Sequence, residues 1–370
     1  MNSRRVFTTA ICAVLACSTI STAVLGQTTP GAMSGNGDGL LPPSSETTVD
    51  QSQGAGRYDV GFDQSCCSRW TASAEFIILQ RVGSFNQTLV ETVPRTQPPS
   101  DPGTQVLNAT DLHQGFSGGP RLGLIHHGDD GNDLEVSYFQ IDGWSDYRSV
   151  GPTPNDWLVM RAPGGFLQTQ DNQNTQMMAW DYASRLYNAE VNVRWNLWPR
   201  MTVLAGFRWV NLTEELQGTL PPERTAPFWD TQTKNNLYGF QIGAEERLFE
   251  RGRFSIGCTG KAGLFENHVD EATSVSIYRV QFGESASTDH LAFLGEIGVG
   301  CTYRVTPRLS LKAGYQAFWL QGVALAPAQI PETYTHSSLI LQDTYVQALG
   351  VNCSSGVLYH GATVGLEYAF

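Results

Sequence analysis

The end of the chain limits what it can fold into more than any other feature. Over the last ten residues, apolar side chains occupy every second position and polar or small ones stand between them, up to the terminal Phe370. This period of two indicates a β-strand with two different faces. Chain ends of soluble domains usually fray, so an amphipathic strand that ends on an aromatic residue favours a barrel closed by its last strand. We expect the barrel-assembly machinery of an outer membrane to be a partner of this strand.

Segments with the same alternation recur along the chain. The clearest are residues 188–197, 201–209, 254–264, 291–304 and 309–319. Their polar positions hold Gly, Ser, Asn or charges of both signs, as the interior of a small barrel requires. Trp and Tyr recur near the strand ends, which is typical of the aromatic girdle at a membrane interface. The sequence therefore predicts an all-β fold: one transmembrane, antiparallel, up-and-down β-barrel over residues 70–370.

The connections support this topology because short and long ones alternate. Very short turns are expected near residues 127–131, 198–200, 250–252 and 306–307. Long external loops are expected over residues 82–115, 144–182, 212–235, 267–288 and 320–357. This parity predicts about ten strands, with both ends of the barrel on the periplasmic side. Segments 274–280 and 338–347 are also β-prone, and with ten strands they are expected to be extensions or a hairpin within the loops. Counting them as membrane strands gives the alternative of about twelve.

The N-terminus has the features of an export signal over residues 1–26. Arg4 and Arg5 form a basic start, an apolar run from Val6 to Ala16 follows, and cleavage is expected before Gln27. Two alternatives are an N-terminal membrane anchor and a lipoprotein box with lipid attached to Cys17. Residues 27–60 are rich in Gly, Ser, Thr and Pro and are expected to form a flexible leader. Each alternative takes the chain out of the cytoplasm.

Charge and cysteine content exclude several classes of function. The net charge is −12 and no basic stripe is present, which argues against nucleic acid as a partner. Five cysteines follow the signal, without a CxxC pair, so the sequence indicates neither a disulfide framework nor a zinc site. Cys258 and Cys301 are expected to face lipid, while pairing among Cys66, Cys67 and another cysteine such as Cys353 stays open.

Several segments resemble, in order and spacing, the planctomycete family of β-barrel porins. They are residues 74–79, 119–124, 134–139, 188–192, 206–212 with 214–215, 236–243, 314–317 and 365–370. The resemblance covers roughly residues 70–370, with the region after Trp319 less typical. It implies an outer-membrane barrel and location in the cell outer membrane, and it implies no particular substrate.

Two short motifs invite a chemical interpretation. Residues 115–119 match the G-x-S-x-G elbow of hydrolases, but Pro120 follows Ser117 where the elbow needs a helix. Ser117 is therefore expected at the start of a strand, with an outer-membrane hydrolase using His113 as a remote alternative. Residues 129–133 carry enough oxygens for a calcium ion but lack the EF-hand spacing, and they suit a tight turn. The neighbouring residues 126–127 are two histidines that should point to opposite faces of a strand.

The charged side chains at alternating strand positions are expected to line the lumen. These are Glu190, Arg194, Arg208, Glu245, Lys261, Glu296, Lys312 and Glu367. They indicate either a polar pore for small solutes or a set of ion pairs that fills a narrow, non-conducting barrel. The expected function is thus a porin-like passive pore or a structural envelope barrel, with surface adhesion through the external loops as the alternative. We expect no enzyme activity, no catalytic, cofactor-binding or metal site, and outer-membrane lipid as the surrounding partner.

Overall fold

We describe the chain from a computed structural model. It describes residues 68–83, 85–98, 101–151, 154–162, 165–168, 177–221, 224–277, 280–330 and 351–370. Ser68–Phe370 forms one compact unit. Among the described residues, no helix has both the length and the apolar character to cross a membrane. The expected signal, the leader, Cys66 and Cys67 lie outside the described residues.

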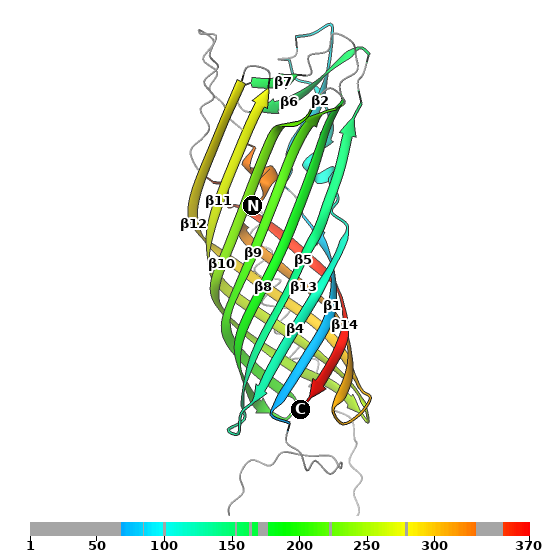
Figure 1. Cartoon of the computed structure of the whole chain (residues 1–370), viewed down its shortest axis with the longest axis vertical. Helices are drawn as coiled ribbons and strands as arrows, with labels where there is room; N and C mark the ends of the chain where they lie inside the picture. The colour runs from blue at the N-terminus through cyan, green and yellow to red at the C-terminus, as the bar shows by residue number, and fades with distance from the viewer. Residues whose placement is uncertain are drawn as a thin grey trace, which may run out of the picture. The chain divides into compact units, whose positions relative to one another are not determined.

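Ten antiparallel strands close into a barrel (Figure 1). In chain order they are β1 (Trp70–Val82), β4 (Phe116–His127), β5 (Asn132–Val150), β8 (Met178–Trp198), β9 (Met201–Leu220), β10 (Arg224–Arg251), β11 (Phe254–Ile277), β12 (Val280–Arg304), β13 (Leu309–Val323) and β14 (Ser355–Ala369). Each strand pairs with its neighbour along the chain, and the barrel closes between β1 and β14. The prediction of an all-β, up-and-down barrel of about ten strands is confirmed, and the alternative of twelve is wrong.

The last strand closes the barrel as its alternation predicted. Pairing with β1 runs from Thr71 opposite Ala369 to Val82 opposite Leu358. The backbones of Trp70 and Phe370 also bond in both directions, at 3.0 and 2.9 Å. The start of β1 and the end of β14 therefore lie at the same end of the barrel, beside the short turns, as the even strand number requires.

Two of the predicted long loops are wrong. Residues 212–235 and 267–288 belong mostly to strands, because β9 continues to Leu220 and β10 begins at Arg224, while β11 ends at Ile277 and β12 begins at Val280. These parts of the strands carry polar residues on the outside, so they lack the apolar alternation of a lipid-facing strand. Backbone pairing nevertheless continues to the tips of both hairpins, β9–β10 and β11–β12. Segment 274–280 is thus an extension of β11 and β12, and segment 338–347 lies outside the described residues.

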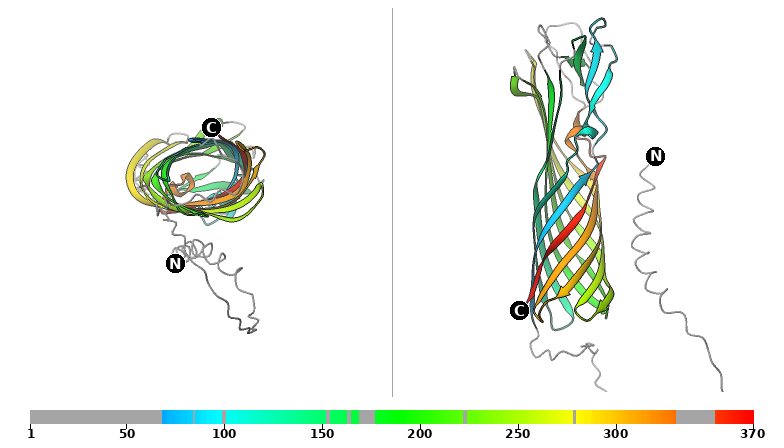
Figure 2. Two further views of the ribbon diagram at one scale, coloured as in Figure 1. Left: turned by 90° about the horizontal axis from the view of Figure 1, so that it is seen from below. Right: turned by 90° about the vertical axis from the view of Figure 1, so that its right-hand side faces the viewer.

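The remaining long connections form structures of their own. The connection over 82–115 contains β2 (Thr88–Pro94) and β3 (Thr104–Asn108), followed by the short 3₁₀ helix η1 (Ala109–Asp111). The connection predicted over 144–182 is shorter, from the end of β5 to the start of β8, and it contains β6 (Asp156–Ala162) and β7 (Gly165–Gln168). These four strands form a second sheet in the order β3-β2-β6-β7. The right-hand view of Figure 2 shows this sheet at the end of the barrel opposite the C-terminus.

The two faces of the barrel wall exchange character along its length. Towards the short turns, large apolar side chains cover the outside, such as Phe240, Ile242 and Leu291 with 75 %, 69 % and 69 % of their surface exposed. Further along β10 towards the second sheet, the outward positions become Lys234 and Gln232, which are both polar. We call the first part the belt half and the part that includes the long hairpins and the second sheet the head.

Candidate functional site

The interior of the belt half contains a buried network of charged and amide side chains. Glu190 of β8 lies at its centre and accepts hydrogen bonds from Lys261 of β11 and Gln241 of β10, each at 2.8 Å. Arg208 of β9 donates to Glu296 of β12 at 2.7 Å. All five side chains are nearly inaccessible to solvent. Alternation directs them inward from five consecutive strands, and their mutual contacts extend across the barrel.

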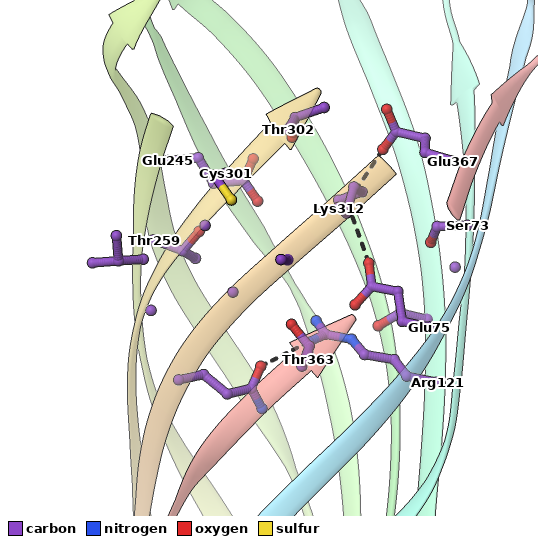
Figure 3. Close-up of a pocket in the computed structure, with 18 of the residues that line it drawn as sticks. Ser73, Glu75, Arg121, Glu245, Thr259, Cys301, Thr302, Lys312, Thr363 and Glu367 are labelled. Atoms are coloured by element: carbon purple, nitrogen blue, oxygen red, sulfur yellow. Dashed lines mark hydrogen bonds and ion pairs between the residues drawn. The ribbon is translucent and has the colours of Figure 1, made fainter. Parts of the chain in front are cut away.

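A cavity of about 280 Å³ lies on the short-turn side of this network. Lys312 of β13 lies between Glu75 of β1, at 3.3 Å, and Glu367 of β14, at 3.2 Å (Figure 3). Arg121 of β4 donates to Gln316 of β13 at 2.7 Å. The cavity is polar, and the charges that line it are compensated mainly by each other.

A second group of charges lines the same cavity. Arg194 of β8 bonds to Glu135 of β5 at 3.0 Å and to Glu245 of β10 at 2.6 Å. A guanidinium group held between two carboxylates is a strong, geometrically fixed arrangement. These side chains join β5, β8 and β10 across the interior, which stabilises a narrow barrel.

The structure places all eight charged residues predicted for the lumen in the interior. They are Glu190, Arg194, Arg208, Glu245, Lys261, Glu296, Lys312 and Glu367. Sequence reasoning missed Glu75, Arg121 and Glu135, which line the same cavity. Each lies directly between two apolar residues in the sequence. Extending the alternation through β1, β4 and β5 would therefore have found them.

On the head side of the charged network, the lumen is filled by an apolar layer. Its buried members are Ile77, Leu79, Phe139, Ile141, Trp144, Leu186, Val210, Leu212, Leu237, Phe265, Ala292, Leu294, Phe318, Leu320, Val323, Leu325, Ala328, Val357 and Tyr359. Phe139 of β5 approaches Phe318 of β13 with ring centroids 6.0 Å apart, although three strands separate them around the wall. Tyr359 stacks on Phe318 at 4.9 Å. Side chains from opposite walls therefore meet in the middle of the barrel.

A chain segment adds to this closure. Gly322–Ile330 begins with the last two residues of β13, includes the 3₁₀ helix η2 (Ala326–Gln329) and is buried throughout. The left-hand view of Figure 2, along the barrel, shows this orange helix inside the ring of strands. The segment contributes to both large apolar clusters of the molecule. It fills space inside the barrel that would stay open if this segment formed a loop outside the barrel.

Inward-facing polar side chains bind the backbone of this segment. Asn235 of β10 accepts from the Ala324 amide and donates to the Ala324 carbonyl, each at 2.8 Å. Asn267 of β11 donates to the Gly322 carbonyl at 3.0 Å. Buried backbone groups need such partners, which explains the asparagines at these two inward positions.

Glu214 of β9 holds the next part of the segment. Its carboxylate accepts from the Ala326 amide at 3.1 Å and from the Tyr182 hydroxyl at 2.7 Å. Arg81 of β1 forms an ion pair with the same carboxylate. Because Arg81 and Glu214 are both buried, the pair depends on these additional hydrogen bonds for its stability.

A further apolar core closes the head. It combines residues of β2, β3, β6 and η1 with the upper parts of β8 to β11 and with η2. Its buried members are Leu89, Val90, Leu107, Ala109, Leu112, Leu158, Met160, Met178, Trp180, Tyr182, Leu216, Leu220, Phe228, Trp229, Val275, Ala326 and Ile330. The second sheet therefore covers the end of the barrel and packs against its inner wall.

The hydrolase motif does not form an elbow. Ser117 lies inside β4, opposite Leu79 of β1, and the strand continues past it to His127. His113 precedes the strand, and its backbone amide donates to Asp146 at 2.8 Å. The expectation that Ser117 lies near the start of a strand is confirmed. The expectation that the chain has no enzyme activity stays a prediction.

The histidine and aspartate motifs lie at a tight turn. His127 faces inward and bonds to Thr71, with 2.8 Å between Nε2 and Oγ1, whereas His126 contacts the Trp70 ring at 4.5 Å between ring centroids. Gly131 has a φ of 79°, a conformation that favours glycine, and Gly128 donates to the carbonyl of Asn132. The described residues contain no group of three or more His, Cys, Asp or Glu suited to hold a metal ion.

Within the described residues, Cys258, Cys301 and Cys353 form no disulfide. By strand alternation, Cys258 of β11 and Cys301 of β12 take outward positions, as predicted, but Cys258 is buried, with 7 % of its surface exposed. Cys353 lies in the segment before β14, where burial raises the pKa of its thiol. A higher pKa leaves less of the reactive thiolate at neutral pH. Lipid attachment to Cys17 lies outside the described residues.

Among the known proteins compared with this chain, only solved structures are similar to it. No family model matches the chain, and no curated protein matches it. The outer membrane protease OmpT from Escherichia coli is similar with 10 % identity and a TM-score of 0.45, over 85 % of this chain and 99 % of that chain. Neisserial surface protein A is similar with 11 % identity and a TM-score of 0.27, over 82 % and 98 % of the two chains.

The P. putida toluene transporter TodX is similar with 8 % identity and a TM-score of 0.31, over 82 % of this chain and 91 % of that chain. Likeness at these values transfers neither a protease nor a transport activity. The resemblance to the planctomycete porin family therefore stays a prediction.

Proposed function

We propose that this chain is an integral barrel of a bacterial outer membrane whose lumen is closed to ions and which anchors a folded head outside the membrane. The observation that carries the proposal is the interior of the barrel. The charged network, the apolar layer and the buried segment Gly322–Ile330 follow one another along the lumen. A structural or surface-presenting role fits this interior better than a passive pore.

The exterior supports the membrane location. Phe240 and Ile242 expose most of their surface on β10, and Leu264 and Leu291 do so on the adjoining strands. A continuous exposed apolar surface of this kind is unfavourable in water and marks a contact with lipid or another apolar partner. Because the belt surrounds a closed barrel, which leaves no unpaired strand edge in the lipid, it is suited to span a membrane. The export signal expected at residues 1–26 and the closing strand ending at Phe370 fit the same location.

Planar-bilayer recording tests the closed lumen. Chain that migrates as a heat-modifiable, folded band is added to the bilayer, and we expect no discrete conductance steps. An open porin inserted in the same bilayer serves as the positive control. Reproducible steps from the folded chain would overturn the proposal in favour of a porin-like pore.

Labelling in intact cells tests the location and orientation. Cysteine introduced by Gln105→Cys in the exposed strand β3 should react with a membrane-impermeant maleimide on intact cells. Cysteine introduced by Arg200→Cys at the turn between β8 and β9 should react only after the outer membrane is permeabilised. Equal labelling of both positions in intact cells, or of neither, would contradict an outer-membrane barrel with this orientation.

A surface-interaction role is the second candidate, supported by the folded head. The second sheet shares the buried core of the head with the barrel strands and ends in strand β3, whose Gln105 and Val106 are exposed. Changing these two residues to Asp should abolish attachment of expressing cells to a surface or to other cells and leave the gel shift of the barrel intact. Attachment equal to wild type would remove this edge of the head from consideration.

A further inference from the structure

The short-turn end of the barrel carries a set of exposed arginines. They are Arg69, Arg200, Arg251, Arg253, Arg304 and Arg308, here called the basic rim. Within the described residues, none of the six forms an ion pair with a carboxylate. A chain of net charge −12 thus concentrates unpaired positive charge at one end.

The rim residues are distributed around the barrel. Arg69 precedes β1, Arg200 lies in the turn between β8 and β9, and Arg253 lies in the turn between β10 and β11. Backbone bonds join them to neighbouring strands, such as the 2.8 Å bond from the Arg304 amide to the Arg253 carbonyl and that from the Ala369 amide to the Arg308 carbonyl. The turn between β4 and β5 interrupts the rim with Asp129 and Asp130, and Glu250 adds an exposed acid paired with Arg247.

Exposed aromatic side chains mark the level of the rim relative to the belt. Trp70 follows Arg69, Phe254 follows Arg253 and Tyr303 precedes Arg304, with 38 %, 38 % and 46 % of their surface exposed. Trp198, which is 60 % exposed, lies two residues before the arginine of its turn. Aromatic side chains at such positions lie at the level of lipid headgroups. The adjacent guanidinium groups therefore lie at or just beyond the phosphates.

We propose that the basic rim binds the headgroups of anionic phospholipids in the leaflet that faces the short turns. This inference rests on the proposed membrane location. A ring of arginines spread over several strands fits a leaflet that surrounds the barrel better than a single globular partner on one side. Guanidinium groups also bind phosphate with paired hydrogen bonds.

Lipid–protein association measured by electron spin resonance tests this inference. The full mature chain is refolded in phosphatidylcholine vesicles that contain spin-labelled phosphatidylglycerol or spin-labelled phosphatidylcholine, and the motionally restricted fraction is compared. We expect the anionic lipid to associate more strongly at low salt, by roughly fivefold where one arginine contacts one headgroup. The preference should shrink as salt is added, because screening weakens exposed charges.

Three variants separate charge from fold. Replacing Arg200, Arg251, Arg253 and Arg308 by Gln should bring the two lipids to nearly equal association, whereas replacing the same four by Lys should retain most of the preference. A control with Arg148→Gln, Arg185→Gln and Lys234→Gln removes exposed positive charge from the head and should keep the wild-type preference. Heat-modifiable migration verifies that each variant is folded.

The outcomes distinguish the two proposals. Equal association of both lipids with folded wild-type barrel would overturn the lipid inference alone, as would a preference that survives the four Gln substitutions or disappears in the head control. A wild-type chain that forms no heat-modifiable barrel in vesicles of either lipid composition would overturn the membrane location itself.

Discussion

The belt half and the barrel part of the head are built from the same strands, yet they place polar and apolar residues on opposite faces. In the belt half of β10, Phe240 and Ile242 lie outside while Gln241 is buried inside. In the head part of the same strand, Gln232 lies outside while Trp229 is buried inside. The strand keeps its alternation and its pairing across this exchange.

This difference indicates where the surroundings of the wall change. In the membrane location proposed above, a side chain on the outside meets lipid in one half and water in the other, so only the belt half needs an apolar exterior. The head instead buries an apolar core, as a water-soluble β-domain does. Tyr238, the outward residue between Asn236 and Phe240, marks the exchange on β10, and Tyr is common at such an interface.

The largest expected effect comes from breaking the charged network in the belt half. Arg208→Met leaves Glu190 and Glu296 buried without their guanidinium partner, and we expect a loss of about 3–5 kcal/mol in the free energy of unfolding. Urea unfolding in vesicles measures it. Arg185→Met, at an exposed position on β8, is the control and should change stability by less than about 0.5 kcal/mol. Similar losses for the two variants would contradict a buried network.

Truncating the core of the head should have the next largest effect. Leu216 is fully buried in the head core, so Leu216→Ala should cost about 3 kcal/mol through lost burial and a residual cavity. The loss should appear as unfolding of the head, seen by increased proteolysis of the second sheet, while the belt half keeps its gel shift. Its sequence neighbour Gln217 faces outward, and Gln217→Ala should leave proteolysis unchanged. Loss of the gel shift together with the head would show that the two halves unfold as one unit.

Charge on the exterior should separate the two halves directly. Phe240→Arg places a charge in lipid and should cost about 2 kcal/mol or more. Gln232→Arg places the same charge on the same face of β10 in the head and should be nearly neutral. Folding equilibria in vesicles give both values. If the two substitutions were equally tolerated, the exposed apolar belt would not be in contact with lipid.

The smallest effect is expected at an exposed ion pair of the short-turn end. Arg247 and Glu250 are 3.0 Å apart, with 52 % and 40 % of their side-chain surfaces exposed. Arg247→Gln should change stability by less than about 0.5 kcal/mol, because solvent and salt screen such pairs. Thermal unfolding in low and high salt measures the difference. A loss as large as that of Arg208→Met would contradict the expectation that the buried contacts of Arg208 contribute more stability than the exposed pair of Arg247 and Glu250.

The sequence predicted the belt half well and the head poorly, for a physical reason. Lipid imposes an apolar residue at every second position, so β8, β9 and the closing strand β14 could be identified from residues such as Val191, Phe207 and Leu366. In the head, inward positions alternate between apolar residues and polar ones such as Thr231 and Asn235. That pattern resembles a polar loop, which is why residues 212–235 and 267–288 were predicted as loops.

The sequence by itself determined the fold class, the even parity of the strands, the closing strand at Phe370 and the inward direction of the charged side chains. Each follows from a local rule, because a strand alternates its side chains and a closed barrel must satisfy its own backbone. Only the tertiary structure decided that the lumen is filled. The contact between Phe139 and Phe318, and the position of Gly322–Ile330 inside the barrel, depend on walls and segments that lie far apart in the chain. Whether opposite walls meet is set by the barrel's cross-section and by side-chain packing, which no local pattern records.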